Sequence, residues 1–175
     1  GNQATVGTED CIAALLDDDR ITTIGMFVEA VRDPQRFARV AMRACEQGVP
    51  LVALQTGRSM TGAEIATSHT GTLAGRTAAY DAMFERYGVA TVRTPAELIE
   101  TLKLLDHGGP IAGKRIVSLS CSGGEASLVA DRSEAGPLVF EPFSEAHRAR
   151  IEATLTELVS VSNPFDYHTF MWGDR

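Results

Sequence analysis

Short apolar runs and stretches of helical periodicity alternate along the chain. Residues 21–28 and 50–54 are β-rich apolar runs without strict alternation, a pattern typical of parallel strands covered on both faces. Around these runs, apolar positions three and four residues apart predict helices. The predicted helices cover residues 8–17, residue 34 to a stop at Gly48, residues 78–87 and residues 95–105, with a short strand over residues 89–92.

Helix-start signals support several of these assignments. Thr8 is predicted as the N-cap of the first helix, and Asp33 with Pro34 starts the second. Residues 94–97, Thr-Pro-Ala-Glu, form a capping box with proline in the first turn. His-Gly-Gly-Pro at residues 107–110 then breaks the helical pattern, and this break is the predicted domain boundary.

Beyond the break the pattern restarts. Residues 115–120 read as a strand, followed by a Gly-rich turn at residues 122–124 and a helix beginning at residue 125. A short strand is predicted at residues 138–140 and a further helix from residue 144, with an apolar face carrying Ile151, Leu155 and Leu158. Alternating strands and helices predict an α/β protein with parallel sheets.

Composition narrows the function classes. The chain has 175 residues, 44% of them hydrophobic, and a formal net charge of −7, which argues against nucleic acid as the main partner. No run approaches the roughly 18 apolar residues of a membrane span. Scattered cysteines without CxxC spacing indicate reduced thiols in the cytoplasm, and the scattered histidines give no expectation of a metal site. The start on Gly-Asn-Gln, without an initiator Met, is expected of a piece of a longer protein.

The stretch most informative about chemistry is Thr-Ser-His-Thr-Gly-Thr-Leu-Ala-Gly at residues 67–75. Ser68, Thr70 and Gly71 offer hydroxyl and backbone N–H donors around His69, and the following helix directs its positive end at them. A neutral imidazole beside anion-binding donors is suited to take up a phosphoryl group. The alternative is a structural histidine in a tight loop at a helix start.

Together with Gly57-Arg58-Ser59 and Gly62, these residues resemble the phosphohistidine segment of the NDP-forming acyl-CoA synthetases. Those enzymes are relatives of succinyl-CoA synthetase in which α-like and β-like parts are fused. Signatures of the same family fall at residues 1–4, 28–29, 122–124 and 162–166, so the resemblance covers almost the whole chain.

The resemblance implies flavodoxin-like α/β/α units with parallel sheets. Residues 1–107 would be an α-like CoA-ligase domain, incomplete at its N-terminus, and residues 112–175 a β-like one, incomplete at its C-terminus. The carboxyl ends of the strands at 21–28 and 115–120 are expected to face a shared crevice.

The resemblance also assigns roles to single residues. His69 would carry the phosphate, and Glu29 matches the carboxylate that pairs with that histidine. Ser122, Gly123 and Gly124 match the start of the β-like helix whose N-terminus cradles the phosphate, with Ser68, Thr70 and Gly71 around the histidine itself.

The activity implied is that of an acid–CoA ligase, with acid, CoA and ATP or GTP in equilibrium with acyl-CoA, NDP and phosphate. The full enzyme would use CoA, ATP/ADP or GTP/GDP, and Mg. Its CoA-binding and ATP-grasp domains are missing here, so this piece should not turn over alone. Cytoplasmic location and homo-oligomerisation are expected, with no nucleic-acid or membrane partner.

Two further interpretations stay open. One is a non-catalytic ligase-like module, as in the ligase-like half of a protein acetyltransferase. The retention of both His69 and Glu29 favours the enzyme over this module. The other is a flavodoxin-like binding domain for a different phosphorylated ligand, which rests on the Gly-rich turns alone.

Overall fold

The computed structural model describes residues 3–59, 61–62, 77–134, 136–156 and 158–168 of the chain. The chain divides into two compact units, residues 1–110 and residues 111–175. Among the described residues, no helix is long and apolar enough to cross a membrane.

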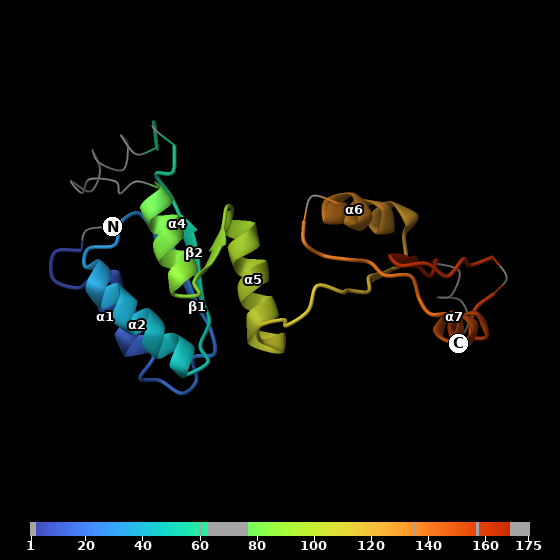
Figure 1. Ribbon diagram of the computed structural model, residues 1–175, viewed down its shortest axis with the longest axis horizontal. Helices are drawn as coiled ribbons and strands as arrows, with labels where there is room; N and C mark the ends of the chain where they lie inside the picture. Colours follow the sequence, from blue (N-terminus) through green and yellow to red (C-terminus); the bar gives the residue numbers. More distant parts are fainter. Residues whose placement is uncertain (1–2, 60, 63–76, 135, 157, 169–175) are drawn as a thin grey trace. The chain divides into compact units, whose positions relative to one another are not determined.

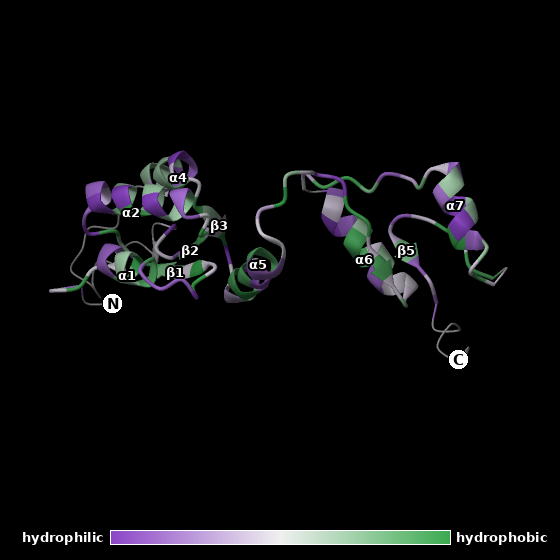
Figure 2. Ribbon diagram, turned by 90° about the horizontal axis from the view of Figure 1, so that it is seen from below, coloured by the Kyte–Doolittle hydropathy of each residue, from purple (hydrophilic) through white to green (hydrophobic). Residues whose placement is uncertain are grey.

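The first unit is built on a parallel sheet in the order β1-β2-β3 (Figure 1). Its strands are β1 (Ile24–Val28), β2 (Leu51–Gln55) and β3 (Ala90–Val92). Helices α1 (Thr8–Leu15), α2 (Pro34–Glu46) and α4 (Thr77–Arg86) pack on one face, and α5 (Pro95–Gly108) packs on the other. Figure 2 shows α2 and α4 together on one side of the strands and α5 apart from them. The predicted α/β/α layering is confirmed.

The main core of this unit lies between the sheet and the three-helix layer. Phe37 of α2 and Phe84 of α4 are fully buried there, with ring centroids 5.8 Å apart. On the opposite face, Val52 and Leu54 of β2 pack against apolar residues of α5. Because successive side chains of a strand point to opposite faces, β2 supplies both cores and is buried at all five positions.

The prediction that residues 21–28 are covered on both faces is wrong for this strand. β1 alternates between buried and exposed positions, and Phe27 is 62% exposed. The reason is that β1 is an edge strand of the described sheet. On that face α5 reaches Gly25, where an added Cβ would lie 2.6 Å from Cδ1 of Leu102, but Phe27 lies beyond this cover.

Most predicted helix starts are confirmed. Asp33 Oδ1 accepts hydrogen bonds from the backbone N–H groups of Gln35 and Arg36 at the start of α2. Thr94 Oγ1 accepts from Glu97 N at 3.1 Å at the start of α5. The first helix differs, because Gly7 is the N-cap and Thr8 is already helical. Asp10 Oδ2 accepts a hydrogen bond from Gly7 N at 2.8 Å. The Asp10 carboxylate, and not the predicted Thr8 cap, therefore pairs with a backbone N–H at this helix start.

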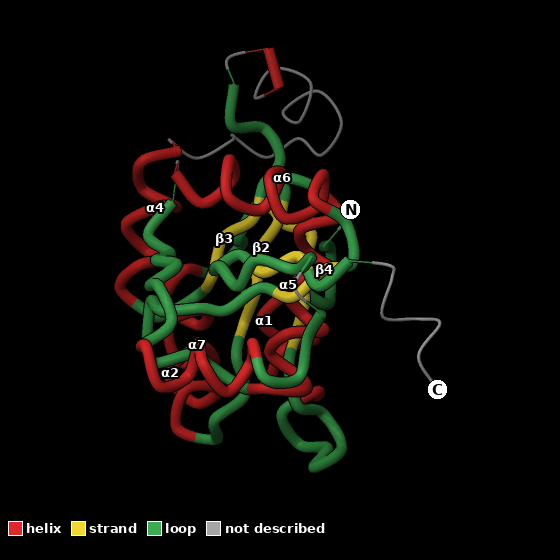
Figure 3. The backbone as a smooth tube through the Cα atoms, turned by 90° about the vertical axis from the view of Figure 1, so that its right-hand side faces the viewer, coloured by secondary structure: helices red, strands yellow, loops and turns green. Residues whose placement is uncertain are grey.

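The second unit contains two short parallel strands, β4 (Leu119–Ser120) and β5 (Phe165–Asp166). Its helices are α6 (Gly123–Glu134) and α7 (Glu145–Glu152), and much of the remaining described chain here is loop (Figure 3). Val159, Val161 and Phe165 form its buried core, against which Ile151 and Leu155 pack. Leu158 was expected on the same helical face but is 75% exposed, because α7 ends at Glu152.

The strands predicted at residues 115–120 and 138–140 are longer than those observed. Only Leu119–Ser120 is a strand, and Arg115 and Val139 form an isolated parallel bridge. The Asn163 side chain explains the interruption. It donates to Ile116 O and Glu141 O, both at 2.9 Å, and accepts from Ser118 N at 3.3 Å. These backbone groups therefore bond to a side chain instead of to a neighbouring strand.

Candidate functional site

The site begins at the carboxyl edge of the first unit's sheet, where ligands bind in open parallel α/β folds. β1 ends at Val28, and the half-buried Glu29 follows directly in a bend. Thr56, the first residue after β2, donates its N–H to Val28 O at 3.0 Å. Glu29 and the segment that leaves β2 therefore start from adjacent points of the same edge.

The loop that carries Glu29 is anchored on both sides. Val31 N donates to the hydroxyl oxygen of Tyr80 at 3.0 Å in a buried hydrogen bond, which ties the loop to α4. Gln3 Nε2 donates to Ala30 O at 3.3 Å, and Arg32 donates to the backbone oxygen of Ala4 at 2.8 Å. These contacts hold the backbone of the residues that follow Glu29.

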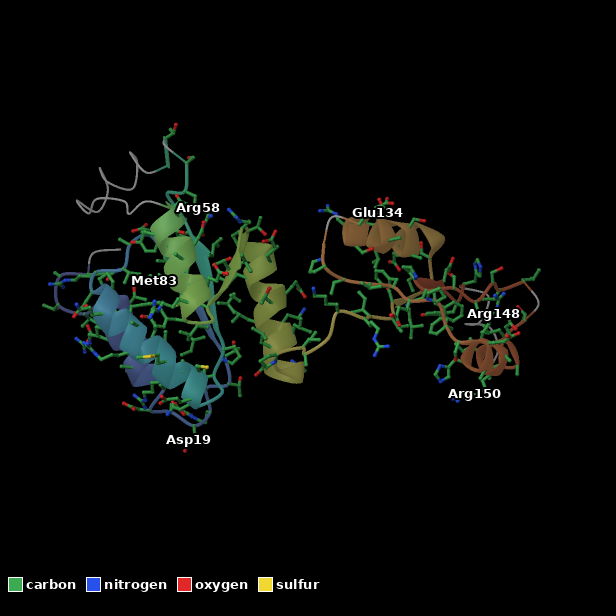
Figure 4. All side chains as sticks on the ribbon, in the orientation of Figure 1. Asp19, Arg58, Met83, Glu134, Arg148 and Arg150 are labelled. Atoms are coloured by element: carbon green, nitrogen blue, oxygen red, sulfur yellow. The ribbon has the colours of Figure 1, made fainter. Side chains whose placement is uncertain are left out.

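Arg58 connects the end of β2 to the start of α4 (Figure 4). Its Nη1 and Nη2 donate to the two carboxylate oxygens of Asp81 at 2.8 and 2.9 Å, a bidentate ion pair. Nη1 also donates to Gln55 Oε1 at 3.0 Å, and Thr77 Oγ1 donates to Arg58 O at 3.1 Å. The ion pair lowers the pKa of Asp81 below its usual value and raises that of Arg58.

Two glycines shape the turn after β2. Gly57 has φ +70°, a backbone conformation that favours glycine. Gly62 N donates to Ser59 Oγ at 3.0 Å, and an added Cβ at Gly62 would lie 3.3 Å from Gly57 Cα. The chain thus folds back on itself immediately after leaving the sheet.

The predicted phosphate carrier His69, with Ser68, Thr70 and Gly71, lies outside the described residues. What the described residues establish is where the intervening segment is attached. It leaves at Arg58 and rejoins at Thr77, which are hydrogen-bonded to each other at the edge that carries Glu29. The pairing of Glu29 with His69 stays a prediction.

In the second unit, the predicted cradle lies at the start of a helix. Gly123 is the first residue of α6, Gly124 follows it, and Ser122 precedes them and accepts from Ser120 Oγ at 3.2 Å through its backbone oxygen. The Asp166 carboxylate reaches the same helix end, since an added Cβ on Gly123 would lie 3.2 Å from Asp166 Oδ2. An anion is favoured at a helix N-terminus, and here a side chain of the chain itself is one such anion.

His168 adds a second polar group beside Asp166. Its backbone N–H donates to Asp166 Oδ1 at 2.9 Å, and its ring Nδ1 lies 3.5 Å from Asp166 Oδ2. In the parts of the chain that the structure describes, no group of three or more His, Cys, Asp or Glu side chains is placed to hold a metal ion.

A wide hollow lies between α2 and α4 and has a volume of about 1140 Å³. Its lining mixes apolar side chains such as Met42 and Met83 with the charged Arg39, Glu85 and Arg86, and neither Glu29 nor Arg58 contributes to it. The hollow does not include the strand end that carries Glu29, so the sheet edge is the better candidate site.

The sequence predicted that Glu29 stands at the end of a strand, and it follows β1 directly, but the residues that hold this edge together were not predicted. Arg58 was part of a recognised motif without a role, and Tyr80 and Asp81 were noticed only as parts of a helix or not at all. The available signal was weak. Thr77 and Asp81 are four residues apart, so the sequence predicts that they share one face of a helix. Only the fold shows that this face lies at the end of β2.

Comparison with known proteins gives the family. The family described as succinyl-CoA ligase like flavodoxin domain matches residues 1–105. The chain belongs to this family. The match covers the whole of the first unit's sheet and most of α5, the part that carries Glu29, Arg58 and Asp81.

Curated relatives are CoA ligases of greater length. The chain is 29% identical over 166 residues to an ADP-forming acetate–CoA ligase of Methanocaldococcus jannaschii, covering 95% of this chain and 23% of that one. It is 33% identical over 166 residues to a trans-feruloyl-CoA synthase from an unknown prokaryotic organism, covering 95% and 24%. The chain therefore spans about a quarter of the length of these relatives.

The fold is also similar to that of a solved structure. This chain resembles the dinucleotide-forming acetyl-coenzyme A synthetase 1 of Candidatus Korarchaeum cryptofilum, solved in complex with phosphate and ADP. The TM-score is 0.83 at 24% identity, over 97% of this chain and 37% of that one. This similarity confirms the flavodoxin-like α/β architecture.

Proposed function

We propose that this chain is the phosphate-relay part of an NDP-forming acid–CoA ligase, in which His69 carries the phosphoryl group. The overall reaction is acid + CoA + NTP in equilibrium with acyl-CoA + NDP + phosphate. The observation that carries the proposal is the convergence of Glu29 with both ends of the His69 segment at one sheet edge. Relatives that are ADP-forming CoA ligases support the reaction class.

The chemistry assigned to the chain's own residues is a two-step transfer. In the direction of acyl-CoA breakdown and NTP synthesis, phosphate first displaces CoA from acyl-CoA to give an acyl phosphate. The lone pair of one His69 ring nitrogen then attacks phosphorus, the P–O bond to the acyl group breaks, and the free acid leaves. NDP finally takes the phosphoryl group, which restores neutral His69 and gives NTP.

Glu29 would orient this nucleophile. A carboxylate that accepts the N–H of one ring nitrogen leaves the other lone pair for phosphorus and stabilises the ring as it becomes positive. The N-terminus of α6, with Ser122, Gly123 and Gly124, would favour the phosphate by roughly 0.3–1 kcal/mol when exposed. The Asp166 carboxylate lies beside the same helix end, so it would compete with a phosphate for that end.

The remaining parts of the proposal concern the larger protein. The first unit would be the α-like and the second the β-like ligase domain. CoA, ATP or GTP, and Mg with the nucleotide would bind mainly through further domains. This piece alone would then be inactive, and homo-oligomerisation in the cytoplasm is proposed for the whole enzyme.

The decisive experiment is labelling of the full-length protein with γ-³²P NTP. We expect an acid-labile, base-stable phosphoenzyme, the stability of a phosphorylated imidazole and not of a serine ester. His69→Ala should abolish both the label and acyl-CoA synthesis while CoA still binds, because removing the nucleophile leaves the other groups nothing to act through. An alanine variant with substantial ligase activity would make His69 a structural loop residue and favour the non-catalytic module.

Glu29→Gln tests the orienting role. The amide keeps the size of the side chain but removes the charge that stabilises the imidazolium. Labelling should slow while the unfolding midpoint stays that of the wild type. A normal labelling rate would refute the pairing of Glu29 with His69 and leave the carrier role of His69 intact.

A further inference from the structure

We propose that Arg58 is a positioning residue for phosphoryl transfer, which holds together the two ends of the segment that carries His69. The inference rests on the proposed function, because it concerns transfer through His69. The residues involved are Gln55, Arg58, Thr77 and Asp81.

Three separate elements meet at the Arg58 side chain. Gln55 ends β2, Arg58 follows the turn after it, and Asp81 lies in α4. One guanidinium nitrogen serves both Gln55 Oε1 at 3.0 Å and Asp81 Oδ1 at 2.8 Å, while the other serves Asp81 Oδ2 at 2.9 Å. The Thr77 side-chain hydroxyl also donates to the backbone oxygen of Arg58, at the same junction.

The geometry needs arginine in particular. A planar guanidinium donates in two parallel directions and can satisfy both carboxylate oxygens and the Gln55 amide oxygen at once, whereas a lysine ammonium is a point charge on a flexible stem. The Arg58 side chain is 21% exposed and Gln55 is buried, so the fork is held from the sheet side. Arg58→Lys therefore keeps the charge and removes the fixed geometry.

The location of this pair matters more than its contribution to stability. Partly exposed ion pairs contribute little to folding. Yet this pair joins the described chain on the two sides of the segment that contains His69, because Arg58 precedes that segment and Asp81 follows it in α4. Displacing a reacting group by about 1 Å can slow a reaction roughly a hundredfold, so a small change at the anchor is amplified in the rate.

The test compares Arg58→Lys with Arg43→Lys in the full-length protein. Arg43 is a matched control, because it also joins distant segments through an aspartate, with Nη2 2.6 Å from Asp17 Oδ1, and is 38% exposed. It lies in the last turn of α2, away from the carboxyl edge of the sheet. Single-turnover labelling with γ-³²P NTP and the thermal midpoint are measured for both variants.

We expect Arg58→Lys to label His69 about ten- to a hundredfold more slowly, with an unchanged KM for the nucleotide. Arg43→Lys should label at the wild-type rate, and the two variants should have similar thermal midpoints. Asp81→Asn is the milder second variant, since it keeps the size and one acceptor oxygen. Combined with Arg58→Lys, it should slow labelling no more than the stronger single variant does, because both act through one contact.

Labelling of Arg58→Lys at the wild-type rate would overturn the positioning role. So would a slower labelling rate in both Arg58→Lys and Arg43→Lys that follows the fall in their thermal midpoints. Additive effects of Arg58→Lys and Asp81→Asn would also overturn it. Failure of the proposed function is distinguishable. If the wild-type protein forms no acid-labile label, or if His69→Ala labels equally, the carrier role itself is refuted and the positioning role with it.

Discussion

Removing one hydroxyl group, by Tyr80→Phe, should loosen the loop that carries Glu29. The Tyr80 oxygen accepts the Val31 N–H at 3.0 Å, and both residues are buried, at 9% and 8% exposure. Phenylalanine keeps the ring and its contact with Phe84, whose centroid lies 5.8 Å away. The change therefore removes the acceptor and little else.

The size of the effect follows from what is left behind. A buried N–H without a partner costs about 1–3 kcal/mol, and any water that reaches Val31 sets the lower end of this range. If the whole penalty falls on the folded state, a loss of about 2 kcal/mol lowers the urea midpoint by about 1 M at a typical m-value near 2 kcal/mol/M. The m-value itself should not change, because the denatured state exposes nearly the same surface.

Amide hydrogen exchange locates the effect. Protection of the Val31 amide should fall roughly 5- to 150-fold, the equivalent of about 1–3 kcal/mol. Tyr87→Phe is the matched control, since it removes the same atom just after the end of α4. Equal Val31 exchange rates and equal urea midpoints in Tyr80→Phe and Tyr87→Phe would show that the Tyr80 hydroxyl does not anchor this loop.

Two further predictions follow. Asn163→Ala removes a side chain that serves the backbone of Ile116, Ser118 and Glu141. At about 1 kcal/mol for each hydrogen bond, it should destabilise the second unit by about 3 kcal/mol in urea unfolding, whereas Ser162→Ala should have less than half this effect, and equal losses would contradict the bridging role. The second prediction concerns acid: the Arg58 hydrogen bonds lower the pKa of Asp81 in the folded state. Their stabilising contribution is therefore complete above the ordinary carboxyl pKa near 4 and lost as pH falls through the lowered value. The stability difference between the wild type and Asp81→Asn should shrink as pH falls from 5 to 2, and a constant difference would show that the pair does not titrate as a unit.

The sequence by itself determined the order of the elements, their approximate ends and the class of fold. Helix periodicity, the Asp33 and Thr94 caps and the break at residues 107–110 are local signals, because a cap or a turn is completed within about four residues of chain. A recognisable motif likewise led to the family before any geometry was known. Glu29 could be placed at a strand end because strand ends are part of the same local pattern.

Tertiary structure decided the features that depend on neighbours far away in the chain. An apolar run looks the same in an edge strand as in a central one, so the exposure of Phe27 followed only from the strand order and the reach of α5. The strand at residues 115–120 is interrupted by a side chain from residue 163, which no window along the chain would contain. Arg58 and Asp81 are 23 positions apart and meet only because β2 and α4 are packed side by side. Local sequence determines where helices and strands form, whereas tertiary packing determines which distant charged side chains meet.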